Sequence, residues 1–567
     1  MTTRARLYCA GGVLAMQFVT GAHAFAAGAL ASAPNPPAAQ EIPLQAGALR
    51  APVAQAAPER FFIQAFDVSG VTRLTTDEVE RLVYPHSGPG RTKDDVEAAR
   101  KALQDAYAAK GYGAVIVDVP TQDHDSFAAG IVRIAVAEAP VGELRVVGSR
   151  HHSLWVAREA VPALVEGEPI NLKALQTQVS AANKFPDRTL DPQFKPGKVQ
   201  GEIDIDLKVT DHLPLHASVE FDNDASPSTT PLRLSASARY TNLFQTGQSA
   251  SFTYVVAPEN PKDTTVFAGS YTVPILNTPF TLSISGYDSN SDVSALGGSE
   301  VLGRGFQVGF RVLYRLPSPT ISQSLSFGAD FKDFKQNVLV SKVQASTAPI
   351  TYIPLEFQYA LAGATEHTSF DFSLATTLGL RALRHVVCVP QSVGPCQLSD
   401  AFQNRQLDSY ENFVRGNMTA DFSYAFTNDM IAAFKLTGQL ADSHLVTNEQ
   451  YAAGGVQTVR GYYSSEAVGD LGISPSVELR SPSLAALFGH WLTEARLYTF
   501  FDSAFIHVYD TQPGQHADFE LMGVGGGLRI RLFSRFSGDV LGAVPLTQGP
   551  STTRFHPRVN FQVKGDF

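Results

Sequence analysis

The chain has 567 residues, 17% of them charged, and a formal net charge of −10. This length predicts more than one structural unit. A net negative charge, without a stripe of Lys and Arg residues, argues against nucleic acid as a partner. The mean hydropathy is near neutral, which suits a soluble protein and equally a transmembrane barrel, whose strands alternate apolar and polar residues.

The chain begins with the pattern of an export signal. Arg4 and Arg6 precede an apolar stretch, and small residues follow it, so residues 1–26 are predicted to be a signal peptide. Residues 27–59 are rich in Ala and Pro and are expected to form a linker or a helix that plugs a pore. After the signal no run of about 18 apolar residues remains, so no membrane-spanning helix is expected.

Residues 60–139 predict a small α+β domain. Thr75 and Glu78 have the spacing of a capping box at the start of a helix, and a second helix is expected to begin near Thr92. Strands precede and follow this helix pair, and the last of them, at 131–137, alternates apolar and polar residues.

Residues 140–211 repeat this plan as a second α+β domain. Asn171 is placed to cap a helix, and the strand at 203–209 alternates strictly, which predicts one buried and one wet face. His151 and His152 have no third metal ligand nearby and are expected to be surface histidines. Nothing in either domain indicates catalysis.

From residue 212 to residue 567 alternating stretches recur without helices between them, and they amount to about sixteen strands. Alternation alone fits a soluble sandwich as well as a membrane barrel, but the connections alternate between tight ones, as at 276–278 and 317–319, and long ones, as at 381–411 and 445–472. Short turns on one rim and long loops on the other are typical of an outer-membrane barrel. The sequence therefore predicts a membrane all-β fold, a 16-stranded antiparallel β-barrel preceded by two small α+β domains.

The final strand carries a further barrel signal. Phe561, Val563 and Phe567 alternate with polar residues and end the chain on an aromatic side chain. Such a strand indicates a transmembrane barrel whose last strand faces lipid.

Two other sets of residues have candidate chemistry. Cys388 and Cys396 are a lone near pair in an exported chain, which favours a local disulfide over a metal site. Gly523 and the glycines at 525–527 lack the Lys-Ser/Thr and the helix of a phosphate loop, so they are expected to make room for packed neighbours. No metal, cofactor or enzymatic activity is therefore expected.

The long connection before the expected twelfth strand contains Val459, Arg460, Gly461 and Tyr462. This run resembles the Val-Arg-Gly-Tyr signature in the sixth external loop of two-partner-secretion transporters, the haemolysin/haemagglutinin secretion-activation proteins. That family belongs to a superfamily that joins POTRA (polypeptide-transport-associated) domains to a barrel. The resemblance extends over nearly all of the mature chain.

The same family carries a Phe-x-Asp-x-Gly motif on the thirteenth strand. The matching residues are Phe500, Asp502 and Ala504, so Ala504 departs from the family's Gly and puts a close backbone approach in doubt. The resemblance implies that Asp502 meets Arg460 inside the barrel, where a carboxylate can take a bidentate contact. The residues alone leave open that Arg460 is a solvated loop residue.

The resemblance implies a translocator that recognises an adhesin-type or cytolysin-type exoprotein in extended form and secretes it from the periplasm to the cell surface. The barrel would lie in the outer membrane as a monomer, inserted by the barrel assembly machinery, with the POTRA-like domains in the periplasm. Two alternatives stay open. One is an outer-membrane-protein assembly and insertion factor of the same superfamily, and the other is a passive porin.

Overall fold

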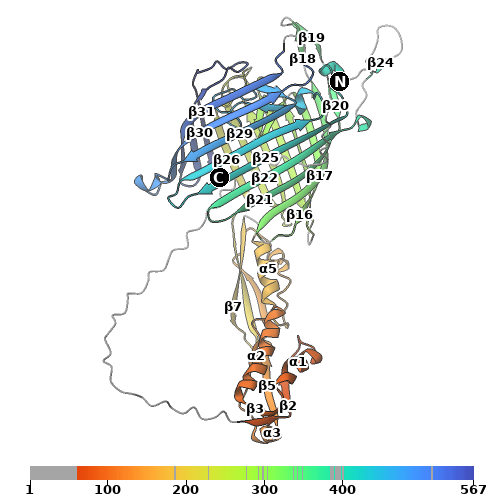
Figure 1. The fold of residues 1–567 in the computed structure, drawn as a ribbon, viewed down its shortest axis with the longest axis vertical. Helices are drawn as coiled ribbons and strands as arrows, with labels where there is room; N and C mark the ends of the chain where they lie inside the picture. The colour runs from red at the N-terminus through yellow and green to blue at the C-terminus, as the bar shows by residue number, and fades with distance from the viewer. Residues whose placement is uncertain are drawn as a thin grey trace, which may run out of the picture. The chain divides into compact units, whose positions relative to one another are not determined.

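The computed structural model describes residues 60–567, which form two compact units, 60–214 and 215–567 (Figure 1). The predicted signal peptide and linker lie outside the described residues. No helix in the described part of the chain is long and apolar enough to cross a membrane. Short gaps interrupt the description at 184–186, 228, 276–277, 292, 297–298, 303, 319, 336, 341–342, 348, 384–387, 390–396, 399–400 and 512–514.

A three-stranded sheet with the order β2-β5-β4 forms the first α+β domain. β2 runs parallel to β5, and β4 runs antiparallel to it. Capping boxes at Thr75 and Thr92 start the two helices, where they satisfy N–H groups of the first turn. Leu103, Tyr107 and Ile134 are fully buried in the core. The elements are β1 (Phe61–Ile63), β2 (Ala65–Ser69), α1 (Thr76–Val83), β3 (Gly88–Arg91), α2 (Lys93–Ala109), β4 (Ile116–Asp118), α3 (His124–Ala128) and β5 (Ile131–Ala137).

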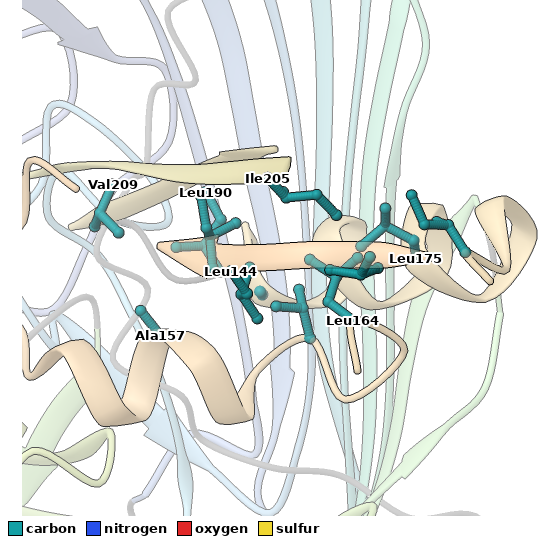
Figure 2. Close-up of a cluster of buried hydrophobic side chains, with 12 residues drawn as sticks. Leu144, Ala157, Leu164, Leu175, Leu190, Ile205 and Val209 are labelled. Carbon is teal, nitrogen blue, oxygen red and sulfur yellow. The ribbon is translucent and has the colours of Figure 1, made fainter. Parts of the chain in front are cut away.

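The second α+β domain repeats this arrangement with the sheet order β6-β8-β7. Asn171 caps α5, since its side chain accepts a hydrogen bond from the N–H of Ala174 at 2.9 Å. Figure 2 shows the core, in which Leu144, Leu175 and Ile205 belong to one cluster of buried side chains. The elements are β6 (Val141–Val147), α4 (Leu154–Glu159), α5 (Leu172–Ala182), β7 (Arg188–Pro196) and β8 (Ile203–Asp211).

Two polar details of the second domain differ from the sequence expectation. The predicted wet face of β8 is covered in part: Arg145 and Lys195 from the flanking strands reach over Asp206, which is 7% exposed, whereas Lys208 is exposed as predicted. The expectation of a surface histidine is wrong for His152, whose side chain is 7% exposed and lies with Nδ1 3.3 Å from Asp211. The side chains of Asp206 and His152 can be buried because each lies beside a charged partner on a neighbouring element.

Sixteen antiparallel strands close into a barrel in sequence order, and β33 pairs with β9 to complete it. β20 and β21 form one interrupted strand, because both pair with β17. The prediction of a 16-stranded antiparallel barrel is therefore confirmed. The strands are β9 (Leu215–Asp222), β10 (Arg233–Leu243), β11 (Gln248–Val256), β12 (Thr265–Pro274), β13 (Phe280–Ser289), β16 (Arg304–Leu316), β17 (Ile321–Lys335), β20 (Ile350–Tyr352), β21 (Leu355–Ala364), β22 (Thr368–Gly379), β25 (Phe413–Ala425), β26 (Ile431–Ala441), β29 (Leu471–Arg480), β30 (Leu492–His507), β31 (Asp518–Leu532), β32 (Phe536–Pro545) and β33 (Arg558–Asp566).

Side chains along the barrel strands alternate between the lumen and the outer surface. On β30, Asp502 and Ala504 are buried inside, whereas Phe501 and Phe505 are 44% and 46% exposed on the outer face. In water, a large exposed apolar surface would promote aggregation. In a membrane, hydrocarbon surrounds the outer face of a barrel, so that face has to be apolar. The apolar side chains therefore face lipid and the polar ones face the lumen.

The C-terminal strand follows the same rule. Val563 and Phe567 are more than half exposed, and the alternation places Phe561 on the same outer face. Phe567 also exchanges backbone hydrogen bonds with Ala217 of β9, at 2.8 and 3.0 Å. The terminal aromatic residue thus takes part in closing the barrel.

The connections alternate in length around the barrel. Turns such as 365–367 and 533–535 join strands at one rim, and loops such as 380–412 and 442–470 join them at the other. The connection at 442–470, between β26 and β29, is the sixth on the long-loop rim, and we call it loop 6. Within the long loops lie β14 (Val293–Leu296), β15 (Ser299–Leu302), β18 (Asn337–Val340), β19 (Val343–Thr347), β23 (Cys388–Val389), β24 (Gln397–Leu398), α6 (Ala401–Arg405), β27 (Tyr451–Ala453) and β28 (Ala467–Gly469).

Candidate functional site

Loop 6 packs against the inner wall of the barrel. It contains a 3-10 turn, η3 (Thr447–Glu449), and a hairpin formed by β27 and β28. Val459 and Tyr462 are 0% and 1% exposed, and Arg460 is 9% exposed. The Val-Arg-Gly-Tyr run therefore lies where it contacts inward-facing residues of the wall.

Arg460 binds Asp502 of β30 through three N–H groups. Nε donates to Oδ2 at 2.7 Å, Nη2 donates to Oδ1 at 2.8 Å, and the backbone N–H of Arg460 donates to Oδ2 at 3.0 Å. The two side-chain contacts have the parallel geometry that a guanidinium makes with a carboxylate. The structure thus brings together the loop arginine and the strand aspartate that the family resemblance pairs.

A second carboxylate, which was not predicted from the sequence, also binds Arg460. Nη1 of Arg460 donates to Oε2 of Glu478 at 2.5 Å, and the guanidinium carbon lies 3.5 Å from the centre of the Phe500 ring, as in a cation–π contact. Ser476 completes the site by donating its hydroxyl to Asp502 at 2.6 Å. The alternation of β29 places Ser476 and Glu478 inward, and this pattern is the sequence signal that could have found them.

The charges around this site balance. Nε of Arg480 donates to Oε1 of Glu478 at 2.7 Å, and Nη1 of Arg529 lies 3.6 Å from the same oxygen. Nε of Arg529 also donates to Asp539 at 2.8 Å. Together with the loop arginine and its strand partner, the network has three guanidinium groups and three carboxylates. Such pairing compensates the desolvation of each charge.

Tyr462 attaches the other end of the motif to β31 and to the connection at 546–557. Its hydroxyl oxygen lies 3.0 Å from the carbonyl of Met522 and 2.9 Å from the carbonyl of Thr547. It also accepts a hydrogen bond from the N–H of Thr547 at 3.2 Å. The motif is therefore held at both Arg460 and Tyr462.

Small residues let the loop come this close to the wall. Gly461 has a φ of +99°, which side chains rarely adopt. A Cβ on Gly523 of β31 would lie 2.1 Å from the carbonyl oxygen of Arg460, so this glycine makes room for a packed neighbour, as predicted from the sequence. The methyl group of Ala504 is completely buried in one cluster with Val459. The extra methyl group thus fills space at the site instead of blocking the loop.

Two acidic residues after the motif attach loop 6 to other loops. Oε1 of Glu466 accepts hydrogen bonds from the backbone N–H groups of Ser551 and Thr552, at 2.5 and 2.7 Å. Oδ2 of Asp470 accepts one from the N–H of Tyr509 at 2.8 Å. These partners lie in the connections that follow β32 and β30, so loop 6 is bound to its neighbouring loops as well as to the wall.

Residues 201–530, more than half of the chain, match the family described as haemolysin secretion/activation protein ShlB/FhaC/HecB. The chain belongs to this family. Residues 61–139 match the ShlB-type POTRA domain, which identifies the first α+β domain. Members of the ShlB/FhaC/HecB family are outer-membrane barrels with POTRA domains in the periplasm, and the predicted family and location are confirmed.

Relatives of the chain extend this picture. HuxB, a heme/hemopexin transporter protein of Haemophilus influenzae, is 22% identical over 501 residues, which cover 83% of this chain and 81% of HuxB. The outer membrane transporter CdiB of Escherichia coli is 26% identical over 169 residues, only 30% of this chain and 28% of CdiB.

Solved structures share the fold. CdiB from Escherichia coli has a TM-score of 0.61 at 19% identity, covering 91% of this chain and 92% of CdiB. BamA from Haemophilus ducreyi, solved without its POTRA domains 1–3, has a TM-score of 0.52 at 15% identity, covering 89% and 100%. At these identities the likenesses show the architecture alone.

Proposed function

We propose that this member of the ShlB/FhaC/HecB family recognises a partner exoprotein of the adhesin or cytolysin type in the periplasm and secretes it to the cell surface. The observation that carries the proposal is the Val-Arg-Gly-Tyr loop held against the lumen wall by Arg460 and Asp502. Its polar contacts are hydrogen bonds and ion pairs, which a displaced loop exchanges for contacts with water. The names of HuxB and CdiB describe both as transporters, which supports transport as the activity.

We expect the second α+β domain to capture the partner along a sheet edge. In the first domain this edge is covered, because Gln104 donates to the carbonyl of Val115 at 2.6 Å and accepts from the N–H of Val117 at 3.0 Å. In the described sheets β7 pairs only with β8, and Asn183 covers its edge only at Leu190, which leaves the edge open from Pro192 to Pro196. An extended polypeptide that adds there gains main-chain hydrogen bonds with little demand on its sequence.

With no ATP site expected from the sequence, export runs downhill, driven by folding of the partner outside the cell. We propose that the chain works as a monomer and is inserted by the barrel assembly machinery. Residues 28–55 are either a plug of the lumen or a plain linker, and deleting them raises single-channel conductance only in the first case.

A secretion assay tests the proposal. A candidate exoprotein with an amino-terminal secretion domain is co-expressed with the wild-type chain, with Arg460→Ala, or without the chain, and its appearance on intact cells is measured by protease accessibility. We expect surface exoprotein with the wild-type chain, much less of it with Arg460→Ala, and none without the chain. Equal surface exoprotein without the chain would contradict the proposal. A fall of unrelated outer-membrane barrels when the chain is deleted would favour the assembly-factor alternative.

A further inference from the structure

Loop 6 carries a buried carboxylate, Glu449, in a part of the loop that the Val-Arg-Gly-Tyr motif does not include. Glu449 ends the 3-10 turn η3 and is 0% exposed. A fully buried carboxylate is costly unless hydrogen-bond donors and cations surround it. Its surroundings therefore show what holds this end of the loop.

Three strands of the wall supply those donors. Nζ of Lys332 on β17 donates to Oε1 of Glu449 at 2.6 Å, and the hydroxyl of Tyr352 on β20 donates to the same oxygen at 2.5 Å. Nη1 of Arg415 on β25 lies 3.2 Å from Oε2. A fourth strand, β26, binds the backbone, because Nε2 of Gln439 donates to the carbonyl of Glu449 at 3.0 Å.

The contacts lie beside an apolar cluster. Tyr352 packs edge-on against Phe402 of α6 with ring centroids 5.3 Å apart, and Leu445 and Val446 of loop 6 belong to the same cluster. Exclusion of water by such a cluster strengthens the ion pairs. The side chain of Lys332 is itself only 7% exposed. Without Glu449 it would be a buried cation lacking its carboxylate.

The two attachment points of loop 6 lie on different parts of the barrel. Arg460 binds the wall at β29 and β30, the twelfth and thirteenth strands, whereas the side chain of Glu449 binds at the seventh, eighth and tenth. We infer that Glu449 is a second anchor of loop 6, independent of Arg460, and that the loop leaves the lumen only when both anchors release. This inference rests on the proposed export function, for which loop 6 must move.

Limited proteolysis of the purified full-length barrel tests the inference. Chymotrypsin cleaves after Tyr462 only when loop 6 leaves the wall, since this side chain is 1% exposed. We expect Arg460→Ala and Glu449→Gln each to raise the cleavage rate modestly. Their double variant should raise it by about the product of the two single effects, as expected of independent anchors, and by about tenfold or more over wild type. Mass spectrometry of the fragments identifies the cleavage site.

Two further variants sharpen the test. Glu356→Gln is the matched control, because Glu356 is a buried carboxylate of β21 that pairs with Arg311 of the wall at 3.0 Å. It should leave cleavage after Tyr462 unchanged. Tyr352→Phe removes one hydrogen bond to Glu449 and keeps the ring, so in the Arg460→Ala background it should raise cleavage by about fivefold.

The outcomes separate the anchor from the export function. If Arg460→Ala alone is cleaved as fast as the double variant, or if Tyr352→Phe adds nothing to it, Glu449 does not anchor the loop. Loss of heat-modifiable gel mobility in Glu449→Gln, with Glu356→Gln intact, would also overturn the inference, because Glu449 would then hold the barrel itself. If the double variant releases the loop but the partner exoprotein is still secreted as by wild type, the anchor stands and the export role of the loop fails.

Discussion

Arg460 directs one guanidinium group at two carboxylates and an aromatic ring. Because Asp502 takes the bidentate contact and Glu478 takes the remaining Nη1, both charge and planarity are used. We expect Arg460→Ala to lower exoprotein secretion by about tenfold or more while the barrel stays folded. Arg460→Lys should also fail largely, since an ammonium group cannot make the planar two-point contact. A secretion assay with heat-modifiable gel mobility measures both effects.

The partner residue gives the complementary prediction. Asp502→Ala should lower secretion somewhat less than Arg460→Ala, because Glu478 remains as an acceptor. The double variant should be little worse than Arg460→Ala alone, as expected of residues in direct contact. Arg496→Ala is a suitable control, because Arg496 pairs with Asp429 in the turn 426–430 at 2.9 Å. Strictly additive losses would contradict a working pair.

Asp211 in the periplasmic unit predicts a pH dependence of stability. Its carboxylate accepts hydrogen bonds from the N–H groups of Arg150, His151 and His152 at 2.8 to 3.0 Å. Burial alone would raise the pKa of Asp211, but the N–H groups of His151 and Arg150 outweigh it and hold the pKa well below its usual value. A depressed pKa stabilises the fold above the unfolded value of about 3.9, and this stabilisation is lost as the pH falls below it.

We therefore expect Asp211→Asn to lower the free energy of unfolding of residues 60–214 by about 1–3 kcal/mol at pH 7. The difference from wild type should shrink as the pH falls below about 4. Urea unfolding followed by circular dichroism at several pH values measures it. Asp191→Asn, at an exposed position of β7, is the control. A difference that stays constant down to pH 2 would contradict the assignment.

The open edge of β7 is unusual for a strand that is proposed to capture a polypeptide. Asn183 binds both the N–H and the carbonyl of Leu190, at 2.7 and 3.0 Å, so both groups point away from β8. By the alternation of an antiparallel pair, the backbone groups of Pro192, Phe194 and Pro196 point the same way. Proline has no N–H. Phe194 therefore supplies the outward N–H between the two prolines of this edge.

This arrangement predicts that Phe194→Pro weakens binding of the exoprotein's secretion domain by about tenfold, because a backbone hydrogen bond is lost. The fold should be kept, since the N–H of Phe194 takes no part in the ladder with β8. Phe194→Ala retains the N–H and is the matched control, which should bind nearly as wild type does. Titration calorimetry with residues 60–214 gives both affinities. Equal losses in the two variants would point to the aromatic ring instead.

Loop residues 380–412 contain the predicted disulfide. Cys396 and the side chain of Cys388 lie outside the described residues, so the bond stays a prediction. The loop between the two cysteines is short, and we expect a local stabilisation of about 2–3 kcal/mol. Mass spectrometry of the unreduced mature protein should find no alkylatable thiol at either position. Two free thiols there would contradict the bond.

Within the periplasmic unit, the two α+β domains are joined through helix ends. The N–H of Leu172, at the start of α5, donates to the carbonyl of Gly111, just after α2, at 2.9 Å. Gly111 has a φ of +95°, and a Cβ there would lie 2.4 Å from Oδ1 of Asn171. We expect Gly111→Ala to loosen this joint and to broaden the distribution of distances between spin labels on the two domains. An unchanged distribution would show that the joint tolerates the methyl group.

At the scale of the whole molecule, some features of the fold and the site could be predicted from the sequence and others could not. Alternation and loop length are local patterns, so they identified the barrel, its strand number and the loop that carries Arg460. The family motif supplied Asp502. Glu478 and Glu449 were missed because their roles depend on where loop 6 folds within the closed barrel. The burial of His152 was missed because its partner, Asp211, lies 59 residues away in the sequence.

The seam between the first and last strands has a consequence for the order of folding. Its ladder spans only five residue pairs, against eight between β32 and β33. Loop 6 contacts both sides of this seam, since Ser464 donates to Asp224 after β9 at 2.7 Å and Glu466 accepts from Thr552 before β33. Closure of the sheet and docking of the loop are thus coupled, so the nascent barrel completes both in one cooperative step after its C-terminal strand arrives. A chain truncated before that strand would remain an open sheet with its lumen loop undocked.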